Sequence, residues 1–157
     1  MKSYTPQIGA IFYSLWALLH IVGAAVLLQQ LAGEGATAFL ATVGSAAPAA
    51  EMPVVSGRVI NSVLAYYAWH LLWVGLLVLV VAIWLNWRNS RAGYWLNLAV
   101  TGAIEVGLIV TLLRPGTMAL TDGGLGLALW LPAVIFSSIG VFNLPPIADR
   151  QPLTADS

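Results

Sequence analysis

Four long runs of apolar residues constrain the fold of this chain more than any other feature. They cover residues 8–31, 59–85, 93–113 and 125–142. A helix needs about 20 mostly apolar residues to cross the hydrocarbon core of a bilayer. The sequence therefore predicts an all-α integral membrane protein, in which a bundle of four transmembrane helices forms a single domain over residues 1–157.

Composition supports a lipid environment. Only 8% of the 157 residues are charged, whereas an ordinary soluble domain has about 25%. A net charge of zero gives no reason to expect nucleic acid as a partner. The chain has no cysteine, which excludes disulfides, thiolate metal sites and cysteine catalysis.

The first run has an alternative interpretation as a signal peptide, because Lys2 resembles its charged start and Ala36-Thr37-Ala38 resembles a cleavage site. The run is longer than the apolar region of a signal peptide, which has about 7–15 residues. We therefore expect a transmembrane helix over residues 8–31.

The segments between the runs are polar or rich in small residues. Residues 32–58 predict a long extramembrane loop, which is either a lid over the end of the bundle or a mobile connector. Within it, the spacing of Phe39, Leu40 and Val43 favours a short interfacial helix over Ala36–Val43. A Gly-rich loop is expected over residues 117–126, and a polar tail over residues 147–157.

Basic residues near the helix ends predict the orientation. One side of the membrane would hold Lys2, Arg88, Arg91 and Arg150, and the other Arg58 and Arg114. Because cytoplasmic loops are enriched in Lys and Arg, we expect a multi-pass protein of the cell (inner) membrane with both termini in the cytoplasm.

Three ionisable side chains interrupt the apolar runs, namely His20, His70 and Glu105. A charged side chain at the bilayer centre costs about 2.5–3.5 kcal/mol on insertion scales, so such groups usually face a bundle interior. With a rise of about 1.5 Å per residue, all three lie about 16–18 Å from a helix end, close to the midplane. The sequence predicts that they meet, either as catalytic groups or as ligands of a metal ion.

Other polar and aromatic residues share faces with these three. Asn97 and Thr101 precede Glu105 at intervals of four residues and predict a polar strip. A second strip of small residues, Ala99, Ala103 and Gly107, would let another helix of the chain or a neighbouring protomer approach closely. The candidate ligand-binding residues are therefore Asn97, Thr101, Tyr66, Trp69, Trp73, Tyr13 and Trp16.

Several chemistries fit this group. Two histidines and a carboxylate suit iron, zinc or another divalent ion, and histidine also ligates haem. A His/Glu pair can transfer protons. The alternative is a structural role, in which the side chains only hydrogen-bond between helices.

One family resemblance rests on Val106-Gly107 after a polar residue, the Gly-rich loop and Pro132-Ala133. Over helices three and four, the layout resembles the small intramembrane isomerases of the styrene oxide isomerase type. The resemblance implies a haem between protomers. Their haem-ligating histidine near the start of helix two has no counterpart here, because His70 lies much deeper.

We therefore expect a midplane site for a lipophilic small molecule, haem or a divalent metal. If this site is catalytic, we expect an isomerase or an oxidoreductase. The alternatives are a non-enzymatic accessory subunit of a membrane complex and a small oligomeric transporter or channel. The expected partners are the lipid bilayer and either further copies of the chain or the other subunits of such a complex.

Overall fold

The computed structural model describes residues 4–48 and 57–143, and this part of the chain is helical without a strand. Two helices end in a wider π-helical turn. The elements are α1 (Thr5–Gly33), α2 (Ala36–Val43), α3 (Arg58–Val81) with its π turn η2 (Ala82–Asn86), α4 (Arg91–Leu108) with its π turn η3 (Ile109–Leu113), and α5 (Leu120–Phe142).

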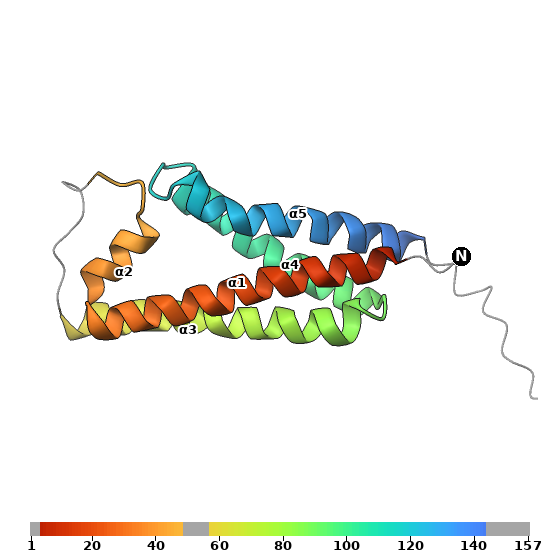
Figure 1. The fold of residues 1–157 in the computed structure, drawn as a ribbon, viewed down its shortest axis with the longest axis horizontal. Coiled ribbons are helices and arrows are strands. Elements are labelled where there is room, and N and C mark those ends of the chain that lie inside the picture. Colours follow the sequence, from red (N-terminus) through yellow and green to blue (C-terminus); the bar gives the residue numbers. More distant parts are fainter. Residues whose placement is uncertain (1–3, 49–56, 144–157) are drawn as a thin grey trace, which may run out of the picture.

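Within the described residues, four helices are long and apolar enough to cross a membrane: α1, α3 with η2, α4 with η3, and α5. The predictions of an all-helical chain and of four helices long enough to span a membrane are confirmed for the described residues. In Figure 1, α1 runs between α3 and α5, and α4 lies behind it. The start of α1 and the end of α5 lie at one end of the bundle, which we call the terminal end, and α2 lies at the opposite end.

Small residues let α1 pack closely against α3. Both helices bury small residues at intervals of seven: Ala10, Ala17 and Ala24 of α1, and Ala68 and Gly75 of α3 with Ala82 at the start of η2. A Cβ atom on Gly75 would lie 3.1 Å from the carbonyl oxygen of Ala17, so the two backbones are nearly in contact. Membrane helices associate through such surfaces because lipid offers no hydrophobic driving force between them.

The small-residue strip predicted on the third transmembrane helix, Ala99, Ala103 and Gly107, does not lie at a contact between helices. Ala99 and Ala103 are exposed, and a Cβ atom on Gly107 would have no contact within 4 Å. This strip therefore does not pack against another described helix. The close contact between helices is made instead by the small residues of α1 and α3 at intervals of seven, which were not predicted from the sequence.

The expected Gly-rich loop over residues 117–126 is wrong for most of its length, because α5 already begins at Leu120. Its glycines provide close packing instead of turns. A Cβ atom on Gly123 would lie 2.9 Å from Cδ2 of Leu113. Pro132 lies inside α5, as expected.

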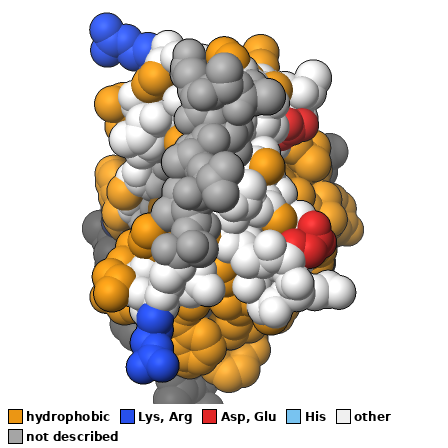
Figure 2. All heavy atoms as spheres, turned by 90° about the vertical axis from the view of Figure 1, so that its left-hand side faces the viewer, with side chains coloured by type: hydrophobic (Ala, Val, Ile, Leu, Met, Phe, Trp, Pro, Cys, Tyr) orange, Lys and Arg blue, Asp and Glu red, His pale blue; other side chains and the backbone are white. Residues whose placement is uncertain are grey.

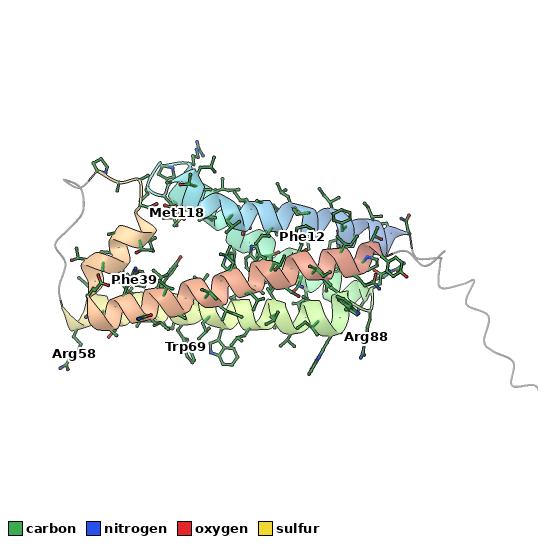
Figure 3. The ribbon with its side chains drawn as sticks, viewed as in Figure 1. Phe12, Phe39, Arg58, Trp69, Arg88 and Met118 are labelled. Atoms are coloured by element: carbon green, nitrogen blue, oxygen red, sulfur yellow. The ribbon has the colours of Figure 1, made fainter. Side chains whose placement is uncertain are left out.

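The segment after α1 contains the predicted short helix, α2, with the predicted bounds Ala36–Val43. Residues 49–56 and the expected tail over 147–157 lie outside the described residues. Phe39 is buried beside Leu27 and Ala68, and its position between α2 and the α1–α3 pair is visible in Figure 3. At the other end of α2, Ala46 N–H donates to the carbonyl of Thr117 over 3.1 Å. The segment therefore extends across the end of the bundle.

Candidate functional site

A cavity of about 730 Å³ occupies the half of the bundle next to α2. All five helices contribute to its wall, which is mainly apolar. Thr42 and Val43 of α2 line it at the end of the bundle, and His20 and Gly126 line it near the middle. Figure 2 faces this end and shows basic side chains at its upper left and bottom edges and acidic ones at its right.

Two histidines from different helices line this cavity, and each ring is fixed in the same way. Nδ1 of His20 donates to the carbonyl of Trp16 over 2.8 Å, and Nδ1 of His70 donates to the carbonyl of Tyr66 over 2.9 Å. Because a carbonyl can only accept, the proton of each neutral ring is on Nδ1, which leaves Nε2 as an acceptor. Each Nε2 can therefore accept a hydrogen bond, take up a proton or ligate a metal.

Glu105 is fully buried next to the first of these histidines. The indole N–H of Trp16 donates to its Oε1 over 2.5 Å, whereas its Oε2 has no hydrogen-bond partner among the described residues. The Trp16 ring also stacks on His20, with ring centroids 3.7 Å apart. One tryptophan thus positions both the carboxyl and the imidazole.

The two ionisable groups converge on Gly126 of α5. A Cβ atom there would lie 2.9 Å from Oε1 of Glu105 and 3.6 Å from Cε1 of His20. Gly126 and His20 line the cavity, while Glu105 does not. The carboxyl therefore lies directly behind the cavity wall, close to the His20 ring.

The predicted metal set of His20, His70 and Glu105 is not assembled. Nowhere in residues 4–48 and 57–143 do three His, Asp or Glu side chains gather as a group able to hold a metal ion. His70 is exposed on α3, and the Trp16 indole already occupies one oxygen of Glu105.

The aromatic residues predicted to bind a ligand on α3 point the other way. Tyr66 is 65% exposed, Trp69 50% and Trp73 55%, and Figure 3 shows Trp69 directed away from the bundle. The reason is that Ala68 and Gly75 of α3 and Ala82 of η2 place the small-residue face of this helix inward. The large rings on its other face then meet lipid.

The predicted residues on α1 and α4 do face inward. Tyr13, Trp16, Asn97 and Thr101 are all at most 1% exposed. None of them lines the cavity, because they lie closer to the terminal end of the bundle. They belong to a buried polar core next to the cavity.

Several cavity residues were missed by the sequence analysis. Gly23, Tyr67, Thr111 and Asp122 line the wall beside His20 and His70. The sequence offers no signal for them, because open space beside a helix depends on where its neighbours lie; only the structure shows it at Gly23 and Gly107. A Cβ atom on either glycine would have no contact within 4 Å.

Comparisons with protein-family models, with curated proteins and with solved structures found no match for this chain.

Proposed function

We propose that this protein binds a lipophilic small molecule inside the membrane, in the cavity between its helices. The observation that supports this most is the 730 Å³ cavity with two imidazole rings on an otherwise mainly apolar wall. Ligand sites usually have about 300–1,000 Å³ and a few polar groups in an apolar lining. Because both Nε2 atoms are acceptors, the ligand carries a hydrogen-bond donor such as a hydroxyl group.

The arrangement also supports an enzymatic form of this function. His20 lies on the cavity wall and Glu105 lies behind it, on the two sides of Gly126. Such a pair can remove a proton from one position of a bound molecule and return it at another. The reaction class is therefore an isomerisation by proton transfer, which needs no electron acceptor.

Filling the cavity tests the proposal. Gly23→Leu and Gly107→Leu would place side chains in open space from two different helices, since neither position has a contact within 4 Å. The control is Ala103→Leu, one turn before Gly107 on α4 and exposed. The probe is a brominated phenol with an alkyl chain, and the readout is quenching of tryptophan fluorescence in detergent micelles.

We expect saturable quenching in the wild type and in Ala103→Leu, and at least tenfold weaker binding in both glycine variants. Equal binding by Gly107→Leu and Ala103→Leu would contradict the proposal.

An absorbance spectrum of the purified protein tests the cofactor alternative. A Soret band that His20→Ala or His70→Ala abolishes would identify haem as the occupant of the cavity.

The orientation and assembly belong to the same proposal. Arg58 and Arg88 lie at opposite ends of the bundle (Figure 3), and the excess of basic residues at the terminal end supports cytoplasmic termini in the cell (inner) membrane. The cavity end would then face outward.

The exposed Ala99 and Ala103 support a homo-oligomer, whereas a colourless protein that co-purifies with fixed partners would indicate an accessory subunit.

A further inference from the structure

The polar side chains that line the cavity are almost all hydrogen-bond acceptors. Side chains with nitrogen or oxygen atoms come from all parts of its wall: His20, Thr42, Tyr67, His70, Thr111 and Asp122. The Nδ1 protons of the two histidines are already donated to backbone carbonyls. Their Nε2 atoms can therefore only accept a hydrogen bond from a neutral ligand.

Both threonines of the wall also donate their hydroxyl protons to other protein groups. Oγ1 of Thr42 donates to Oε1 of Gln30 over 2.9 Å, and Oγ1 of Thr111 donates to the carbonyl of Gly107 over 2.7 Å. Toward the cavity, each hydroxyl oxygen is left as an acceptor. Tyr67 is the exception, because a phenol can donate as well as accept.

The only formal charge on the cavity wall is negative. Among the described residues that line the cavity, Asp122 is the one carboxylate, and none is a lysine or arginine. Asp122 lies in the first turn of α5, where a carboxylate is favourable in any helix because of the macrodipole. That effect does not require the side chain to border a cavity, as this one does.

Asp122 and His20 border neighbouring parts of the cavity. Asp122 precedes Gly126 by four residues on α5, so the two lie on one face of the helix about one turn apart. Both line the cavity, and a Cβ atom on Gly126 would lie 3.6 Å from Cε1 of His20. A headgroup beside this turn of α5 therefore has the carboxylate on one side and the imidazole on the other.

We propose that the ligand of this cavity is a lipophilic amine in its protonated form. This inference rests on the proposed function and names the class of its ligand. An alkylammonium group has one positive charge and three hydrogen-bond donors but no acceptor, which matches a wall of acceptors with one carboxylate. Its hydrocarbon chain would contact the apolar side chains of α1 and α3 in the wall, namely Val22, Val26, Leu27, Leu71 and Val74.

Three probes that differ only in their headgroup test the proposal. They are bromodecylamine, bromodecanol and bromodecanoic acid, and they are added to the full chain in micelles of an uncharged detergent at neutral pH. The saturable part of the quenching of tryptophan fluorescence measures binding, and Gly107→Leu, which fills the cavity, gives the background. We expect the amine to bind at least threefold more tightly than the alcohol and at least tenfold more tightly than the acid.

Asp122→Asn keeps the shape of the side chain and removes its charge. Because Asp122 is exposed and exposed ion pairs contribute only moderately, we expect amine binding to weaken at least threefold. Binding of the alcohol should stay unchanged, which also shows that the variant is folded. Asp122→Glu retains the carboxylate and should retain the preference for the amine.

The matched control is Glu34→Gln. Glu34 follows directly after α1 at the same end of the bundle, and it is exposed but does not line the cavity. This variant removes the same charge from the protein surface and should bind all three probes like the wild type. An equal loss of amine binding in Glu34→Gln and Asp122→Asn would overturn the proposal, because attraction by the net charge would then explain it.

The probes also separate this inference from the proposed function. Wild-type protein that binds the alcohol as tightly as the amine would overturn the amine ligand and leave the lipophilic site intact. So would unchanged amine binding in Asp122→Asn. If no probe gave saturable quenching that Gly107→Leu removes, both the site and its ligand class would be rejected.

Discussion

The indole nitrogen of Trp16 lies 2.5 Å from Oε1 of Glu105, so one hydrogen bond joins α1 to α4 across 89 positions of the sequence. Both side chains are 0% exposed. Hydrogen bonds are electrostatically stronger in such surroundings than in water, and an unpaired buried polar group is correspondingly costly. This contact therefore holds the carboxyl of Glu105 in place behind the cavity.

Removing the donor should destabilise the bundle. Trp16→Phe leaves the buried carboxyl of Glu105 without its partner, and we expect the free energy of unfolding to fall by about 1–3 kcal/mol. The measurement is unfolding in mixed detergent micelles, and the control is Trp69→Phe at a site that is 50% exposed. Equal stability of the two variants would show that the indole hydrogen bond contributes nothing.

A methyl group at Gly126 should disturb the site itself. In Gly126→Ala, the new Cβ would lie 2.9 Å from Oε1 of Glu105, so the carboxyl has to move. We expect weaker binding of the phenol probe. The matched control is Gly102→Ala, where the nearest side-chain atom is Cζ2 of Trp130 at 3.8 Å; there, binding should be unchanged, and a loss equal to that in Gly126→Ala would refute the prediction.

The crossing of α1 and α3 should tolerate no side chain at Gly75. A Cβ there would lie 2.8 Å from Cγ1 of Ile21 and 3.1 Å from a backbone oxygen. Overpacking of this kind costs about 1–3 kcal/mol, which exceeds the gain of about 1 kcal/mol in helix propensity. Gly75→Ala should therefore lower the melting temperature in detergent, whereas Gly107→Ala, with no contact within 4 Å, should not. The reverse order of the two melting temperatures would contradict this packing.

The docking of α2 should depend on Phe39. This side chain is 1% exposed and packs edge-on against Tyr67, with ring centroids 6.1 Å apart. In Phe39→Ala we expect faster amide hydrogen exchange over residues 36–43, while exchange in the centres of α1 and α3 stays slow. Thr37→Ala, on the exposed side of α2, is the control. Unchanged exchange in Phe39→Ala would show that other contacts hold the helix.

Much of the fold follows from the sequence. Long apolar runs must form helices in a bilayer, because every backbone polar group has to be satisfied within the segment. Helical periodicity also predicted that Asn97, Thr101 and Glu105 share one buried face, and it predicted the bounds of α2. These features depend on length and spacing along one helix, which the sequence contains completely.

The tertiary structure decided how the helices are rotated against each other. In lipid, an apolar face gives little information about which side turns inward, since lipid and protein interior are equally apolar. Close approach at Ala17 and Gly75 set this rotation. It turned Trp69 and Trp73 toward lipid. Within the described residues, it also did not bring His70 and Glu105 into a group able to hold a metal ion.

The sequence by itself determined four helices long and apolar enough to span a membrane, and the shared buried face of Asn97, Thr101 and Glu105. Only the packing decided that Trp16 supplies its hydrogen bond, that the glycines before Gly126 belong to a helix, and that a cavity lies between α2 and His20. The physical reason is that spacing along one helix selects a face, whereas a cavity depends on where several helices fail to touch.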